Sequence, residues 1–198
     1  MSTQLTAQQL RDLTQHQNSM KPKPTPEEMI NLCLVDDRKE NALSFIQWLK
    51  DNKLSPTWNT ANQWRSNYKS KHKICFVALC GRYGRFSDIS AEKDIIGSWR
   101  IRLKFDRNAQ YAEKDFFSEK VEKVIQDSIN RCGYLEKRLP NRCMACPGPN
   151  PWNVYNENIG VVCPNHEMIS FVNPDAETIE AAKKIILVNR DNIIEAVK

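Results

Sequence analysis

The amino-acid sequence predicts an α+β protein, in which an antiparallel sheet is backed by helices and a small irregular lobe rich in Cys and Pro precedes the C-terminal helix. Three observations lead to this class. Residues 99–105 alternate between apolar and polar side chains, which is typical of a half-buried strand. Leu43, Ile46 and Leu49 recur at helical spacing. Residues 133–174 hold six of the ten prolines and show no long periodicity, so we expect this stretch to be irregular.

Length and composition indicate one globular domain. The chain has 198 residues, of which 40% are hydrophobic, and its 29 basic and 24 acidic side chains give a net charge of +5. This balance excludes a collagen, a coiled coil and a wholly disordered chain. We expect a polar N-terminal arm with a short helix over residues 1–24, and a single α+β domain over residues 25–198 that includes the lobe at 133–172.

The sequence also bears on the compartment. Its longest apolar stretch, residues 74–80, is far shorter than the ~20 residues that a membrane-spanning helix needs. Residues 1–20 lack the apolar core of a secretory signal. Seven cysteines, an odd number, favour buried thiols or a metal site over a disulfide framework. We therefore expect a cytoplasmic protein that has no membrane partner.

Helices are expected in the first third of the chain. A capping-box pattern predicts a short helix over residues 6–17, and the Lys-Pro-Lys-Pro run at 21–24 predicts a stiff connector. Pro26 stands at the first position of the next helix, where its missing N–H is tolerated. The run of charges at 36–40 predicts a break before another helix, which ends near Asn52.

Strands are expected in the middle third. Trp64, Ser66 and Tyr68 alternate with polar residues, which predicts an outer strand. The wholly apolar run 74–80 predicts a central strand that is buried on both faces. The strand at 99–105 has one apolar face and one basic face.

Two more helices are expected in the C-terminal half. A stripe of apolar residues that continues for four turns predicts a helix from Asp115 to Gly133. The sequence Asn-Pro-Asp at 173–175 predicts the start of the last helix, with a polar interruption at 189–192.

Four residues of the lobe have the spacing of a zinc site. Cys143 and Cys146 form one pair separated by two residues, and Cys163 and His166 form a second. This spacing lets each tight turn point two donor atoms at one tetrahedral ion. Because four protein ligands leave no position for water, we expect the zinc to be structural. It would hold together a segment that has too few apolar residues for its own core.

The main alternative for these cysteines is a set of free, partly buried thiols. Cys132 adds a nearby thiol, but the resulting spacing matches neither common ferredoxin pattern. The prolines after Cys146 disfavour a thioredoxin-like redox pair. No His is followed at the required spacing by the Glu of a zinc deaminase.

The basic strand is the second candidate site. Arg100, Arg102 and Lys104 recur at every second position, so they project from one face of the strand. A row of cations suits phosphate groups or a small anionic ligand, and Trp64 and Tyr68 are candidate aromatic neighbours. The alternative is a solvated face whose basic side chains serve solubility. These five residues form the candidate ligand-binding set, and no catalytic residue is predicted.

The order of elements resembles that of certain small uncharacterised bacterial sheet proteins. The shared features are a Trp to Tyr-Lys hairpin that leads into residues 74–79, a basic strand, a helix, a Cys-containing lobe and the segment 171–179. The resemblance implies an antiparallel sheet backed by helices, and it carries over no functional residue.

These patterns predict a cytoplasmic binding or sensing module that has a structural zinc and recognises a protein partner or a small anionic ligand. One alternative is an enzyme whose active site lies in a sheet pocket around Trp64, Tyr68, Arg100 and Arg102. Another is a zinc-containing nucleic-acid-binding protein, for which we would expect a continuous positive surface.

Overall fold

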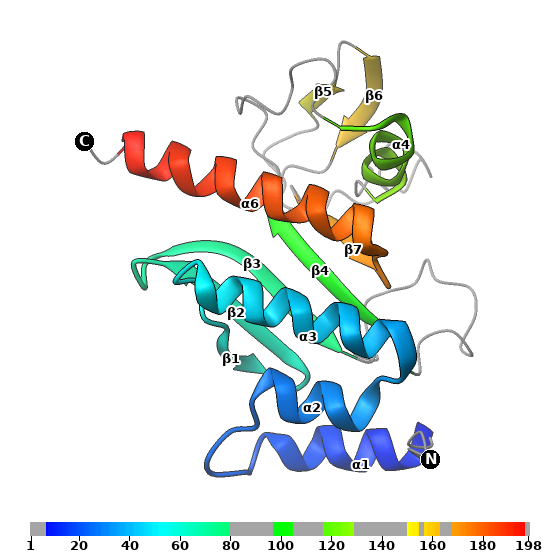
Figure 1. The fold of residues 1–198 in the computed structure, drawn as a ribbon, viewed down its shortest axis with the longest axis vertical. Coiled ribbons are helices and arrows are strands. Elements are labelled where there is room, and N and C mark those ends of the chain that lie inside the picture. Colours follow the sequence, from blue (N-terminus) through cyan, green and yellow to red (C-terminus); the bar gives the residue numbers. More distant parts are fainter. Residues whose placement is uncertain are drawn as a thin grey trace, which may run out of the picture.

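The computed structural model describes residues 7–79, 97–104, 117–128, 150–154, 157–162 and 168–196. It confirms the α+β class, because a five-stranded antiparallel sheet packs against helices (Figure 1). The strand order is β1-β2-β3-β4-β7, and a separate two-stranded sheet has the order β5-β6. The strands are β1 (Thr57–Thr60), β2 (Gln63–Tyr68), β3 (His72–Leu79), β4 (Trp99–Lys104), β5 (Asn150–Val154), β6 (Glu157–Val162) and β7 (Met168–Val172). The helices are α1 (Ala7–Gln17), α2 (Pro26–Cys33), α3 (Asp36–Asp51), α4 (Glu119–Ser128) and α6 (Ala176–Ala196).

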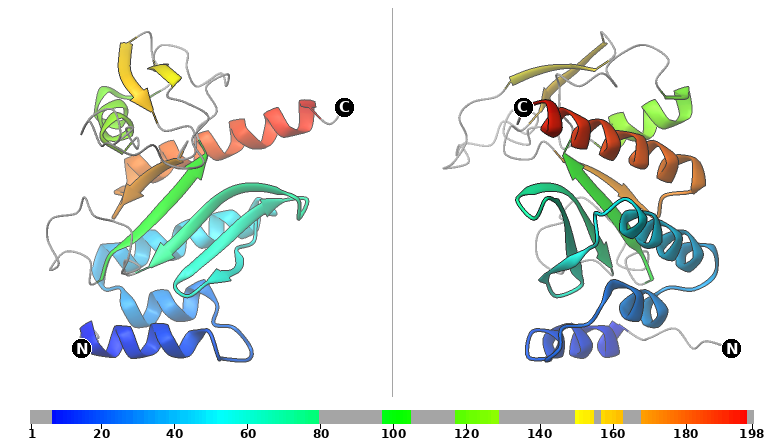
Figure 2. Two further views of the ribbon diagram at one scale, coloured as in Figure 1. Left: turned by 180° about the vertical axis from the view of Figure 1, so that it is seen from behind. Right: turned by 60° about the vertical axis from the view of Figure 1, so that its left-hand side comes forward.

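Helix α3 lies behind the strands of the large sheet when the molecule is seen from the back, whereas α1 lies below the sheet (Figure 2). The strand side chains on the side of α3 join those of α2, α3, α4 and α6 in one hydrophobic core. Burial of such apolar surface is the main source of stability in a domain of this size. The buried strand residues on this face are Trp64, Cys75, Val77, Leu79, Trp99, Ile101, Leu103, Ile169 and Phe171.

Strand order confirms one sequence prediction and corrects another. The apolar run that begins at Ile74 lies in β3, which pairs with strands on both sides and is therefore central, as predicted. The segment 64–68 lies in β2, which is not an outer strand because the short β1 pairs with its free edge. A strand of four residues is too short to show the period-2 pattern from which strands are predicted.

Helix boundaries follow local capping. The backbone N–H of Glu28 donates to the Thr25 side chain (3.2 Å) and the Thr25 N–H donates to the Glu28 carboxylate (2.8 Å), which is a capping box. The predicted break at 36–40 is wrong, because α3 begins at Asp36 and places acidic side chains in its first turn, where the helix dipole favours them. The polar stretch 189–192 does not interrupt α6. Within the described parts of the chain, no helix is long and apolar enough to cross a membrane.

Residues 17–24 contact the sheet through buried hydrogen bonds. The Gln17 side chain at the end of α1 is fully buried. Its amide nitrogen donates to the Asn62 side chain (2.6 Å), and its amide oxygen accepts from the Asn62 backbone N–H (2.9 Å). The Trp64 indole donates to the carbonyl of Pro24 at 3.0 Å. Residues 7–26 are therefore tied to the β1–β2 turn and to β2.

Helices α4 and α6 begin beside each other. The Ser118 hydroxyl caps α4 by accepting from the Val121 N–H (3.4 Å), so the helix starts after the predicted Asp115. The Asp175 carboxylate caps α6 by accepting from the Thr178 N–H (2.9 Å), which confirms the predicted start at Asn-Pro-Asp.

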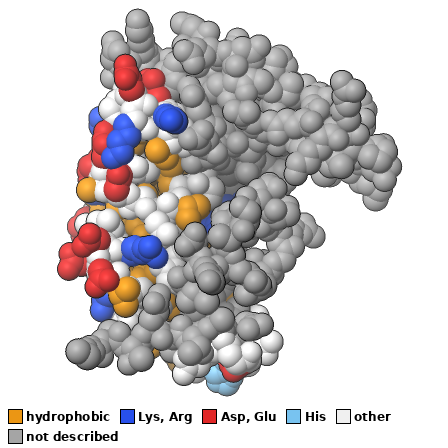
Figure 3. Space-filling view, turned by 90° about the vertical axis from the view of Figure 1, so that its right-hand side faces the viewer, with side chains coloured by type: hydrophobic (Ala, Val, Ile, Leu, Met, Phe, Trp, Pro, Cys, Tyr) orange, Lys and Arg blue, Asp and Glu red, His pale blue; other side chains and the backbone are white. Residues whose placement is uncertain are grey.

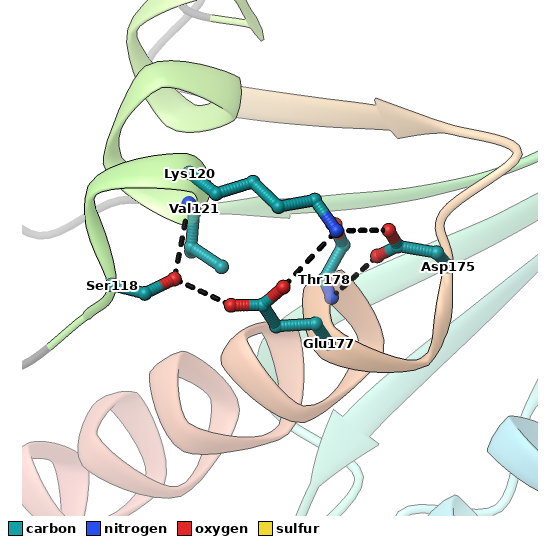
Figure 4. Close-up of polar contacts among 6 residues, drawn as sticks. All are labelled: Ser118, Lys120, Val121, Asp175, Glu177 and Thr178. Carbon is teal, nitrogen blue, oxygen red and sulfur yellow. Dashed lines mark hydrogen bonds and ion pairs between the residues drawn. The ribbon is translucent and has the colours of Figure 1, made fainter.

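Charged side chains join these two helix starts (Figure 4). The Lys120 ammonium donates to the carboxylates of Asp175 (2.6 Å) and Glu177 (3.0 Å), and the Ser118 hydroxyl donates to Glu177 (2.5 Å). The hydrogen bond from Lys120 and those from Thr178 lower the pKa of Asp175 to about 2. The Ser118 and Lys120 hydrogen bonds also lower the pKa of Glu177. We call Ser118, Lys120, Asp175 and Glu177 the α4–α6 junction.

Candidate anion-binding face

Strand register brings two cations from different strands beside one aromatic ring. On the face that points away from the core, Arg65 of β2 pairs with Phe76 of β3, and Phe76 pairs with Arg102 of β4. The same row ends at Ser170 of β7. Arg65 is exposed, whereas Phe76 and Arg102 are half-buried. We call this row, together with Arg100, the basic sheet face.

Arg100 lies in the next row of the same face. It pairs with Ala78 on one side and with Val172 on the other. Its side chain is only 5% exposed, so the sequence-based alternative of a solvated strand face does not describe this residue. Desolvation, followed by repulsion from the Arg102 charge, lowers the pKa of Arg100.

Arg102 shares this dehydrated environment, and burial lowers its pKa as well. Both guanidinium groups nevertheless stay charged at neutral pH, because arginine starts from a very high pKa. A face that carries two guanidinium groups has a positive potential, which attracts anions. Arginine also offers the planar pair of donors that suits carboxylate and phosphate oxygens.

A further polar group lies in the row. The Ser170 hydroxyl is buried and has no hydrogen-bond partner in the part of the chain that the structure describes. Its neighbour across the ladder is Arg102. A buried hydroxyl without a partner is unfavourable, and an oxygen of a ligand or water can relieve it.

The structure does not bring all five candidate ligand-binding residues together. Arg100 and Arg102 share the basic sheet face, and the backbone of Lys104 continues the β4–β7 ladder opposite Met168. Trp64 lies on the opposite face, fully buried in the core. Tyr68 is half-buried and packs against the same core. The sheet pocket that we considered for an enzyme, with both aromatic residues beside the two arginines, is therefore not assembled.

Sequence reasoning missed Phe76, because a wholly apolar strand gives no sign of which face a residue occupies. Arg65 joins this face only because β2 pairs with β3, which the sequence pattern does not reveal. Register supplies the missing information: once β2, β3 and β4 are aligned, a half-buried ring stands between two arginines.

The predicted zinc ligands Cys143, Cys146, Cys163 and His166 all lie outside the described residues. Within those residues, no group of three or more His, Cys, Asp or Glu side chains is arranged to hold a metal ion. Cys33 and Cys75 are buried and do not form a disulfide with each other, and burial raises the pKa of the Cys75 thiol to about 12, so its thiolate form is rare at neutral pH.

Comparison with known proteins adds no functional information. No protein-family model matches the chain, and no match was found among curated proteins or solved structures.

Proposed function

We propose that this protein is a binding module whose basic sheet face holds an anionic ligand. The observation that carries the proposal is the register of Arg65, Phe76 and Arg102, which sets cations from β2 and β4 on either side of one ring. Arg100 adds a second guanidinium from β4. The two guanidinium groups of β4 give this face a positive charge, and their paired donors suit carboxylate and phosphate oxygens, which supports an anion as the ligand.

Retention on phosphocellulose tests the proposal. We expect Arg65→Gln and Arg102→Gln each to elute at lower salt than the parent protein, because each variant loses one charge-assisted contact. Lys123→Gln is the matched control, since Lys123 is exposed on α4 and the variant loses the same charge. Equal shifts in all three variants would show that retention depends on net charge alone, which would contradict a specific site.

The proposal includes a structural zinc in the lobe, bound by Cys143, Cys146, Cys163 and His166. Its support is the ligand spacing in the sequence. We also propose a cytoplasmic location, where such thiols would stay reduced. Elemental analysis of purified protein should find about one zinc per chain, and Cys143→Ser or Cys163→Ser should lose it. A folded, metal-free parent protein would contradict this part of the proposal.

A further inference from the structure

We propose that the anion bound at the basic sheet face is a single strand of nucleic acid, whose backbone follows the β2–β3 hairpin and one of whose bases stacks on Phe76. This inference rests on the proposed function and names its ligand class. It is carried by the distribution of charge along the first three strands, by the hairpin tip and by the surroundings of the ring.

Charge is segregated in the sequence around these strands. No acidic residue occurs between Asp51 and Asp88, although the chain as a whole has 24. The described part of this stretch contains five basic residues, which are Lys53, Arg65, Lys69, Lys71 and Lys73, all of them exposed. Figure 3 shows another side of the molecule, where acidic and basic side chains lie close together. Polyanion binding requires such a cationic stretch without neutralising carboxylates.

Two of these lysines, Lys69 and Lys71, lie in the tip of the β2–β3 hairpin, and Lys73 follows in β3. The Lys71 N–H donates to the Tyr68 carbonyl (3.2 Å), and Lys69 and Ser70 have φ values of 47° and 59°, which together define a type I′ turn. Glycine and asparagine are the usual residues at such positions. Within the described residues, Lys71 makes no side-chain hydrogen bond or ion pair, and Lys69 contacts only the Tyr68 ring. The tip therefore presents unpaired cations.

The ring of Phe76 is set where a strand of nucleotides would cross the sheet. Arg65 and Arg102 flank it from two neighbouring strands, so the two cations are separated by about two strand spacings, or ~10 Å. The Lys73 ammonium lies 5.4 Å from the centre of the ring. Because Lys73 is exposed, this contact is weak, and an incoming base can displace the ammonium toward a phosphate.

These features favour a single strand over a duplex or a membrane. A ring that is half-buried between strands can stack only on a base that has left its own stack, as bases do in single strands. An anionic membrane would require apolar side chains that insert, but the only large hydrophobic residues exposed in the described parts are Leu32 and Val172, of which Val172 alone lies on this face.

Fluorescence anisotropy with a labelled oligothymidylate of about 20 nucleotides tests the inference, with an abasic strand of equal length as the reference. We expect the oligothymidylate to bind about tenfold more tightly than the abasic strand. Phe76→Leu should remove most of this difference, and Phe76→Tyr should retain it, because tyrosine keeps the stacking ring. Lys71→Gln should weaken both probes and lower the salt dependence by about one released counterion. Lys123→Gln is the control.

The outcomes distinguish the proposed function, which is anion binding, from the inference that the anion is a single strand of nucleic acid. The inference would be overturned by equal affinity for the oligothymidylate and the abasic strand, by tighter binding of a duplex, or by binding of phosphatidylserine vesicles in place of oligonucleotide. In each of these cases, retention on phosphocellulose that depends on Arg102 would leave the proposed function intact. Retention on phosphocellulose that is the same in the parent and in Arg102→Gln would contradict the proposed function itself. If Phe76→Leu fails to fold, the comparison of oligothymidylate with the abasic strand on the parent protein still decides the inference.

Discussion

Two polar junctions connect distant parts of this chain, and they are built in opposite ways. At the first, the fully buried amide of Gln17 holds Asn62 through two neutral hydrogen bonds. At the second, the α4–α6 junction, charged groups meet at the surface, where the side chain of Lys120 is 58% exposed and that of Asp175 is 53% exposed. The first junction fixes the N-terminal helix to the sheet, and the second aligns two helix starts.

The two junctions differ in the environment of the polar groups that lose a partner when one residue is removed. Without Gln17, the N–H of Asn62 and its side-chain oxygen each lose a buried hydrogen bond, and the loss of a buried hydrogen bond carries a desolvation penalty. Without Lys120, the carboxylates of Asp175 and Glu177 return to water. Exposed ion pairs therefore contribute little, and buried neutral amides contribute more per bond.

Gln17→Ala should have the largest effect on stability. Because two buried polar groups of Asn62 lose their partner, we expect a loss of about 2 kcal/mol in the free energy of unfolding, measured by urea denaturation. Gln15→Ala is the matched control, since Gln15 is exposed on the same helix and its replacement should change stability by less than about 0.5 kcal/mol. Equal effects for the two variants would mean that the buried amide pair does not anchor α1.

Asp175→Ala should have the next largest effect. It removes the side chain that caps α6 as well as the partner of Lys120, and loss of a cap typically costs about 1 kcal/mol. Asp175→Asn keeps a capping oxygen and loses only the charge, so we expect it to cost a few tenths of a kcal/mol. Urea denaturation of the two variants separates the cap from the ion pair, and an equal loss in both would assign the whole effect to the charge.

The two junctions should also differ in their response to pH. The pKa of Asp175 is lowered from 3.8 to about 2 in the folded protein. Its charge therefore stabilises the fold fully above the unfolded value, and this contribution is lost as the pH falls toward 2. We expect the stability gap between the parent and Asp175→Asn to shrink between about pH 5 and pH 2, while the gap for Gln17→Ala stays constant. A constant gap for Asp175→Asn would show that the ion pair contributes nothing.

Lys120→Ala should have the smallest effect. The ammonium is exposed and its hydrogen bonds to the two carboxylates are screened by salt. We expect a small decrease in the melting temperature at low ionic strength that disappears at about 1 M NaCl. Lys123→Ala, in the next turn of α4, should show no decrease at either salt concentration.

Local signals in the sequence predicted the elements that depend on local chemistry. The helix start at residues 173–175, the central position of β3 and the basic face of β4 could each be predicted, because capping residues, an unbroken apolar run and side-chain alternation are each encoded within a few residues. The docking of α1 could not, because Gln17 and Asn62 are 45 positions apart and nothing in either neighbourhood indicates the other. The basic sheet face was predicted only within β4, since the contributions of Arg65 and Phe76 depend on strand register.

The pairing of Lys104 with Met168 bears on where the chain can accept insertions. Strands β4 and β7 form an antiparallel pair, and the segment of chain between them contains α4, β5 and β6. The entropy of closing such a loop grows only with the logarithm of its length, so doubling it adds about 0.6 kcal/mol. Insertions between Ser128 and Cys143, which precede the proposed zinc ligands, should therefore leave the strand register intact, and a grafted peptide or an affinity tag has its best prospect of being accepted there.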